Sequence, residues 1–160
     1  VSSLQIIFNV LRQKPIKTIF ESALGKQVAL IVRLPLASGL LSGKFSQNTS
    51  FAENDHRNFN RNGEHFNVGE TFSGLPYEKG LDLIGQLEKM IPNDTSISLA
   101  ALRWILDFEA VSVVIPGSKS PEQVLHNCGA SKLPPLVPSL HERLEQFYNK
   151  EVTPFIRGKY

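Results

Sequence analysis

The sequence contains a single cysteine, Cys128, among its 160 residues. One cysteine cannot form an intramolecular disulfide, which excludes a secreted scaffold held by disulfides and favours a reducing, cytoplasmic location. An excess of either charge is also absent, because 17 lysines and arginines stand against 15 aspartates and glutamates. This balance gives no reason to expect a nucleic acid or an anionic membrane surface as a partner.

Long hydrophobic runs are absent too, and none approaches the ~20 residues that a membrane-spanning helix needs. The first residues, Val1 to Gln5, lack the basic and apolar regions of a signal peptide. There is no initiator methionine, since Met90 is the only methionine. We therefore expect no membrane association and a chain cut from a longer protein, although processing also removes initiator residues.

The composition is that of a globular protein, with 41% hydrophobic residues. Three apolar runs predict strands at 4–8, 28–32 and 111–115. Apolar residues at helical spacing predict helices at 16–26, 77–90, 96–108, 121–130 and 140–148. Apolar strands that alternate with helices indicate an α/β fold with a parallel sheet covered on both faces.

A long connection from Ser46 to Gly74 is rich in Asn, Gly, Ser, Glu and His. Connections of this length in a compact domain are usually functional or mobile. Its phenylalanines, at 51, 59, 66 and 72, predict a loop that packs on the rest of the chain.

Three parallel strands leave two unpaired edges, which invite aggregation when exposed. Either further chain completes the sheet or the chain pairs with another copy. A (β/α)₈ barrel typically needs ~250 residues, and this chain supplies a little over half of that length. We therefore interpret residues 1–160 as a partial domain, incomplete at its N-terminus.

Two loops that follow predicted strands are candidates for binding a phosphate, at 33–39 and at 117–120. In (β/α)₈ enzymes a phosphate site commonly follows the last two strands, at a helix N-terminus. Ser120, Pro121 and Gln123 are typical cap, first-turn and capping-box residues of such a helix. Its free N–H groups attract an anion, and Lys119 adds a positive charge. Taken alone, such a turn is usually only a turn.

Both loops resemble segments of aldo-keto reductases. Residues 32–45, Val-Arg-Leu-Pro-Leu-Ala-Ser-Gly-Leu-Leu-Ser-Gly-Lys-Phe, resemble the segment after barrel strand seven, and residues 114–127 the segment after strand eight. Residues 101–106 are similar to the helix between them, and residues 4–9 to strand six. The resemblance covers essentially the whole chain and implies the C-terminal part of a (β/α)₈ TIM barrel.

The resemblance further implies an oxidoreductase that reduces a small aldehyde or ketone with NADPH. Gln5 matches the residue that hydrogen-bonds the nicotinamide carboxamide. Arg33 matches a position where many members stack an aromatic ring on the nicotinamide, and a guanidinium plane can also stack. Lys44 matches a basic residue that reaches the phosphates in some members, and Arg57 or Arg61 could contribute similarly. The loop over the pyrophosphate matches Leu34, Pro35, Leu36, Ala37 and Ser38.

The adenosine end of the cofactor is matched by Gly117, Ser118, Lys119, Gln123 and Asn127. Ser118 and Lys119 correspond to the site of the NADP 2′-phosphate, and Asn127 to an adenine contact. Gln123 stands where some members have an arginine that holds this phosphate, and His126 where glutamate is common. These two departures leave NAD open as an alternative to NADP.

The family's catalytic Asp, Tyr, Lys and His come from the first half of the barrel, and no position of this chain matches them. We therefore predict no catalytic residue here, and interpret Tyr77, Tyr148 and Tyr160 as packing or surface residues. The four histidines show no spacing typical of a metal site.

Three hypotheses follow for the function. The chain is the cofactor-binding half of an NADPH-dependent carbonyl reductase, which we favour, and it is then inactive by itself. Alternatively it is a non-catalytic nicotinamide-nucleotide-binding module resembling the potassium-channel β subunits of the same family. A third hypothesis is a structural fragment that folds only with its missing N-terminal half or another copy.

Overall fold

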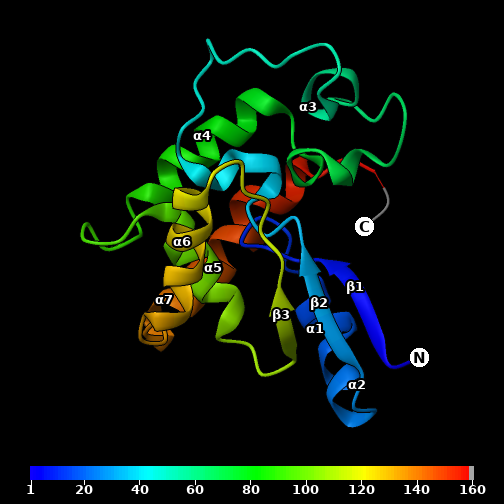
Figure 1. Ribbon diagram of the computed structural model, residues 1–160, viewed down its shortest axis with the longest axis vertical. Helices are drawn as coiled ribbons and strands as arrows, with labels where there is room; N and C mark the ends of the chain where they lie inside the picture. The colour runs from blue at the N-terminus through cyan, green and yellow to red at the C-terminus, as the bar shows by residue number, and fades with distance from the viewer. Residues whose placement is uncertain (159–160) are drawn as a thin grey trace.

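Three strands form one parallel sheet in the order β1–β2–β3 in the computed structural model, which describes residues 1–158 (Figure 1). The strands are β1 (Ser3–Ile7), β2 (Ala29–Arg33) and β3 (Val111–Val114). Each predicted strand is confirmed to within one residue at either end, and the predicted parallel α/β class is confirmed with them.

Four of the five predicted helices are confirmed to within two residues at either end. They are α4 (Tyr77–Glu88), α5 (Ile97–Leu106), α6 (Pro121–Gly129) and α7 (Pro138–Phe147). The prediction of one helix over 16–26 is wrong. Ile19 adopts φ −127° and ψ −35°, which divides the segment into α1 (Pro15–Thr18) and α2 (Phe20–Gly25). Short turns follow the last two helices, at Ala130–Lys132, Tyr148–Val152 and Thr153–Phe155.

The hydrophobic core lies between the sheet and the helices, which Figure 1 shows gathered beside the strands. Leu30 and Val32 of β2 are fully buried in it. The Phe8 ring, directly after β1, lies 4.9 Å from the rings of Phe20 and Trp104, measured between centroids. Contacts between buried aromatic rings stabilise a fold by more than the buried area alone would. Phe8 therefore packs α2 and α5 against the sheet.

The opposite face of the sheet is not covered by the described residues. Gln5, Ile31 and Val113 are register partners on this face. Gln5 is exposed, and Val113 and Ile115 keep 43% and 45% of their surface. The expectation that both faces are covered therefore fails within residues 1–158, where only the helix side is buried. In the three-stranded sheet β1 and β3 are edges, as expected.

The connection between β2 and α4 contains ordered turns instead of a free linker. It includes α3 (His56–Phe59) and turns at Ala37–Ser42, Val68–Glu70 and Phe72–Gly74. Phe72 is fully buried, and Phe51 lies 5.9 Å from it between ring centroids. The predicted packing is thus confirmed for these two rings, whereas Phe59 and Phe66 remain 37% and 41% exposed. In Figure 1 this connection lies at the end of the molecule where the strands finish.

None of the helices in residues 1–158 combines the length and hydrophobicity that crossing a membrane requires.

Candidate functional site

The loop after β2 makes a tight turn that begins with the residue after Arg33. Leu34, Ala37 and Ser38 have φ of 51°, 49° and 56°, and Gly39 has φ of 97°. Non-glycine residues adopt this left-handed conformation rarely, and it persists only where neighbouring structure enforces it. A Cβ atom at Gly39 would lie 2.8 Å from the Phe45 ring, so this position requires glycine. The predicted pyrophosphate loop is therefore a strained turn at the carboxyl end of the sheet.

Asn9, which follows β1 and is fully buried, holds this turn in place. Its Nδ2 donates to the Leu34 carbonyl at 2.9 Å and to the Ser73 hydroxyl at 3.0 Å. Its Oδ1 accepts from the Leu11 N–H at 2.9 Å. The sequence interpretation used Asn9 only as part of a resemblance and missed this function. An amide within an otherwise apolar segment was the available signal, because a buried amide needs partners.

The segment 67–74 clamps the same loop from the other side. The Ser38 hydroxyl donates to the Glu70 carbonyl at 3.1 Å and accepts from the Phe72 N–H at 3.2 Å. The Arg33 guanidinium donates two hydrogen bonds to the Glu70 carboxylate. Phe72 and Ser73 are themselves left-handed, with φ of 51° and 58°. Two strained turns are thus fixed to each other across the ends of β1 and β2.

Charges around Glu70 keep this pair ionised. The hydrogen bond from Arg33 lowers the pKa of Glu70 most, and the charges of Arg33, Arg12 and His56 lower it further against desolvation by burial. The Glu70 hydrogen bond in turn raises the pKa of Arg33. The carboxylate and guanidinium therefore remain charged and joined across the neutral range.

The two arginines considered for the phosphates, Arg57 and Arg61, are engaged within the long connection. Arg57 makes two hydrogen bonds to Asp55, at 2.9 and 2.5 Å, and its guanidinium lies 4.5 Å from the centroid of the Phe51 ring. The Arg57 hydrogen bonds lower the pKa of Asp55 to about 2. Arg61 lies over the Tyr77 ring, 4.7 Å from its centroid. Both side chains stabilise the connection through these contacts.

The loop after β3 gathers four of the predicted residues. The Lys119 N–H donates to Gln123 Oε1 at 2.6 Å, and Asn127 Nδ2 donates to the Ser118 hydroxyl at 3.0 Å. The predicted cap at Ser120 is present, since its hydroxyl accepts from the Gln123 N–H at 3.3 Å. The capping-box prediction differs in one respect, because the Gln123 side chain accepts from Lys119 and not from Ser120.

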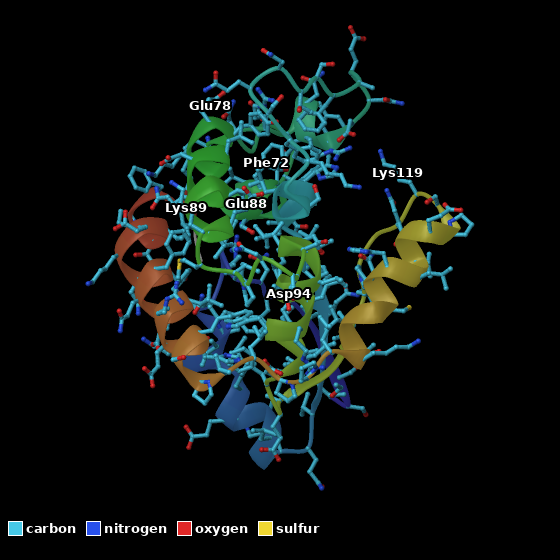
Figure 2. All side chains as sticks on the ribbon, turned by 90° about the vertical axis from the view of Figure 1, so that its left-hand side faces the viewer. Phe72, Glu78, Glu88, Lys89, Asp94 and Lys119 are labelled. Atoms are coloured by element: carbon cyan, nitrogen blue, oxygen red, sulfur yellow. The ribbon has the colours of Figure 1, made fainter. Side chains whose placement is uncertain are left out.

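Open space lies beside Gly117 in this second loop. No atom outside its chain neighbours lies within 4 Å of a Cβ atom placed at Gly117. Figure 2 shows Lys119 at the tip of the loop that leads into α6, at the same end of the molecule as Phe72. His126 turns away toward α5, with Nε2 3.1 Å from the Ser98 hydroxyl. The loop thus offers an exposed cation beside unfilled space.

Gln5 and Lys44 lie apart from these clusters. Gln5 lies in the middle of β1, on the uncovered face, and is not a strand-end residue. Lys44 is exposed beyond the turn Ala37–Ser42. Among residues 1–158, no hydrogen bond or ion pair joins either side chain to another predicted site residue.

The surface hollow near α7 contains none of the predicted residues. It has a volume of about 590 Å³ and includes Arg103, Asp107 and His141 in its lining. Asp107 accepts from Arg103 Nε at 3.0 Å and from the Leu136 N–H at 3.0 Å, and lies 2.9 Å from His141 Nε2. Since its carboxylate is fully engaged, we assign this cluster to the packing of α5 and α7. Within residues 1–158, no group of three or more His, Cys, Asp or Glu side chains is arranged to hold a metal ion.

The two loops have features that suit an anionic ligand. Lys44 and Lys119 are exposed cations that suit phosphate esters, whereas Arg33 is paired with Glu70. Ser38 and Gly39 are small, partly exposed residues of the strained turn and allow a ligand to approach it, whereas Ala37 is fully buried. Both loops follow parallel strands, so they open at the same edge of the sheet.

Comparisons with known proteins identify the family. The sequence matches the family model described as "Aldo/keto reductase family" over residues 1–149. Aldo-keto reductase str7 of Strobilurus tenacellus is 28% identical over 122 residues, which are 76% of this chain and 34% of that protein.

Solved structures show the same architecture. The glycerol dehydrogenase AKR11B4 from Gluconobacter oxydans superposes with a TM-score of 0.76 at 22% identity, over 100% of this chain and 46% of that one. The aldo-keto reductase AKR11C1 from Bacillus halodurans, in its holo form, gives a TM-score of 0.62 at 21% identity, over 92% and 42% of the two chains. The chain thus spans about a third of the curated relative and less than half of the solved chains. Its sheet and helices form part of a (β/α)₈ barrel.

Proposed function

Because this chain belongs to the aldo/keto reductase family, we propose that it forms the cofactor-binding half of an oxidoreductase that reduces an aldehyde or ketone with NADPH. The observation that carries the proposal is the position of two loops, after β2 and β3, at one edge of a parallel sheet. In (β/α)₈ enzymes this edge carries the active site, and the last two strands commonly carry the phosphate site.

Each part of the cofactor has a proposed partner in this chain. Gln5 and Arg33 hold the nicotinamide, on the uncovered face of the sheet. Lys44 reaches the phosphates. The loop over the pyrophosphate comprises Leu34, Pro35, Leu36, Ala37 and Ser38, and the adenosine end is held by Gly117, Ser118, Lys119, Gln123 and Asn127. NADPH supplies the hydride when it is bound, and these residues orient it.

The Ser38 hydroxyl contributes to this site through the shape of the loop. It already donates to the Glu70 carbonyl and accepts from the Phe72 N–H. Its role in the proposal is therefore to fix the shape of the loop over the pyrophosphate, in which Ala37 is fully buried and the Ala37 and Gly39 N–H groups donate to the Leu34 and Leu36 carbonyls.

The proton for the carbonyl oxygen comes, in this proposal, from a residue outside the chain. Tyr77 and Tyr148 are 3% and 6% exposed, and the Tyr77 hydroxyl donates to the Ser46 carbonyl at 2.9 Å. Both are thus packing residues, as the sequence suggested, while Tyr160 lies outside the described residues. We expect the 160-residue chain by itself to leave NADPH unoxidised in the presence of 4-nitrobenzaldehyde.

A second segment completes the barrel in this proposal. Val113 and Ile115 on the sheet, and Val124 and Leu125 on α6, are 43%, 45%, 49% and 74% exposed. Apolar side chains in such number beside an open edge mark a surface that another part of a protein covers. We propose a cytoplasmic location as well, because Cys128 is a free, exposed thiol that a reducing compartment preserves.

Calorimetric titration of the chain with NADPH and with NADH tests the proposed site. We expect saturable binding of NADPH. Lys119→Ala should weaken the binding of NADPH by about tenfold, which is the usual effect of losing one charge-assisted hydrogen bond. The binding of NADH should stay unchanged. Lys132→Ala, in the turn after α6, is the matched control. If neither nucleotide binds, the proposal is wrong.

A non-catalytic nucleotide-binding module is the second candidate. It is favoured by one feature of the proposal: both proposed cofactor loops lie in this chain, whereas we assign none of its residues to catalysis. Co-expression with the upstream half of the parent barrel separates the two candidates. Carbonyl-dependent NADPH oxidation by the complex supports the reductase, and nucleotide binding without turnover supports the module.

A further inference from the structure

Arg33 occupies the position expected to stack on the nicotinamide, and Glu70 grips it along one edge. The hydrogen bonds run from Nη1 to Oε2 and from Nη2 to Oε1, so the two flat groups are joined edge to edge. A guanidinium bound in this way keeps its planar faces available for stacking on a ring. The pair is partly open to solvent, with side-chain exposures of 32% and 29%.

Arg33 and Gln5 lie on the same face of the sheet. Gln5 pairs with Ile31 and Ile7 pairs with Arg33 in the parallel register. Because side chains along a strand alternate between faces, Ile31 and Arg33 point the same way, together with their partners. The guanidinium therefore stands at the carboxyl end of the face on which Gln5 is exposed.

Glu70 itself is firmly placed. The backbone turn that carries it is capped by Asn67, whose Oδ1 accepts from the Gly69 N–H at 2.8 Å. The Glu70 carbonyl accepts from the Ser38 hydroxyl. One residue thus holds Arg33 through its side chain and the pyrophosphate loop through its backbone.

We infer that Glu70 is a positioning residue for the cofactor, which fixes the guanidinium plane of Arg33 as the platform for the nicotinamide ring. This inference rests on the proposed function. An unrestrained arginine would lose rotamer freedom when a ligand stacks on it, and a carboxylate that fixes it beforehand reduces this cost.

Glu70 also has an electrostatic effect that distinguishes the two redox forms of the cofactor. The oxidised nicotinamide ring carries a positive charge, and the reduced ring is neutral. An unpaired guanidinium against the oxidised ring would place two like charges in contact, which is unfavourable. The Glu70 carboxylate balances the Arg33 charge, so the platform accepts both forms.

Calorimetric titrations of the full 160-residue chain with NADP⁺ and NADPH test this inference. Glu70→Gln keeps the shape of the side chain and removes its charge. We expect it to weaken the binding of NADP⁺ by about tenfold, because the Arg33 charge is no longer balanced. The binding of NADPH should weaken by only about threefold, because only the pre-organisation of Arg33 is lost. Glu53→Gln, an exposed carboxylate in the same connection, is the control and should change neither affinity.

Arg33→Phe provides the decisive background. A phenyl ring needs no carboxylate to orient it, so Glu70→Gln should no longer weaken the binding of NADPH in this variant. Glu70→Asp retains the charge and should keep the wild-type ratio of the two affinities even where both weaken. Thermal unfolding shows whether each variant is folded. If Glu70→Gln does not fold, the comparison of Glu70→Asp with the wild-type chain tests the inference instead.

The outcomes separate the inference from the proposed function. Equal weakening of both nucleotides by Glu70→Gln, persisting in the Arg33→Phe background, would show a structural role and overturn the inference. Unchanged affinities in Glu70→Gln, with normal binding by the wild-type chain, would overturn the inference alone. A wild-type chain that binds neither nucleotide would overturn the inference together with the proposed function.

Discussion

At the scale of single residues, Asn9 connects more of the candidate site than any position chosen from the sequence. Its amide joins the ends of β1 and β2 to the turn at Ser73. We expect Asn9→Ala to lower the free energy of unfolding by about 2 kcal/mol, because it leaves the Leu34 carbonyl and the Leu11 N–H without their buried partner. Urea denaturation measures the change. Asn93→Ala, in the exposed loop before α5, should have little effect.

Asp55 makes the long connection sensitive to acid. Its pKa is about 2, below its ordinary value of 3.8, chiefly because Arg57 donates hydrogen bonds to it. A carboxyl group whose pKa is lowered by folding stabilises the fold above its ordinary pKa. This contribution is lost as the pH falls through the folded-state pKa. The window of loss therefore runs from just above pH 3.8 down to about 2.

Asp55→Asn keeps the helix cap and removes the charge, so it isolates this contribution. We expect a lower melting temperature at neutral pH, corresponding to at most about 1 kcal/mol for a partly exposed pair. The difference from wild type should shrink across the window and vanish near its acidic end. Circular dichroism melts at a series of pH values provide the measurement. A difference that stays constant with pH, or one matched by the exposed control Asp94→Asn, would contradict the assignment.

At the scale of elements, the hydrophobic periodicity predicted the positions of the strands and helices but missed the breaks and turns that depend on backbone dihedral angles. Ile16, Ile19 and Phe20 keep helical spacing across a break at Ile19, so the pattern alone showed one helix. Gly25 does end α2, but the left-handed residue nearby is Gln27, with φ of 52°. The spacing of apolar residues indicates which side of an element is buried. The break at Ile19 and the left-handed conformation of Gln27 do not change that side, so the spacing does not reveal them.

The contacts of the candidate site also divide into local ones, which the sequence predicted, and long-range ones, which it did not. Ser118, Lys119, Gln123 and Asn127 lie within one loop and the helix that follows it, so a short motif was enough to find their cluster. The pairing of Arg33 with Glu70 spans 37 residues, and that of Asn9 with Ser73 spans 64. Local propensity and short motifs contain no information on contacts at such separations, which the folded chain alone determines.

Two glycines test how strictly the turn after β2 depends on its conformation. Gly39 combines φ of 97° with the close approach of Phe45. Gly39→Ala should therefore destabilise the chain by about 2 kcal/mol through backbone strain and overpacking. Gly85 is exposed within α4, and a Cβ atom there would have no neighbour within 4 Å. Gly85→Ala should therefore stabilise the chain by up to about 1 kcal/mol. Opposite shifts in chemical denaturation are expected, and equal shifts would show that the turn tolerates a side chain.

At the scale of the whole molecule, the uncovered face of the sheet governs behaviour in solution. The chain buries the helix side of its strands and leaves Gln5 and Val113 exposed on the other side. Both outer strands also have an unpaired edge. Exposed apolar strands with open edges associate with one another unless another segment covers them. We therefore predict that this surface drives self-association of the 160-residue chain.

Val113→Lys places a charge on this face at the edge strand β3 without disturbing the helix-side core, because Val113 is 43% exposed. We expect sedimentation velocity to show oligomers for the wild-type chain and a larger monomer fraction for Val113→Lys, since edge and face charges oppose strand association. Leu24→Lys on α2 is a matched control, being an apolar residue that is 45% exposed on the helix layer. It should leave the distribution unchanged. If the wild-type chain is monomeric, or if both lysine variants act alike, the uncovered sheet face is not the surface that drives association.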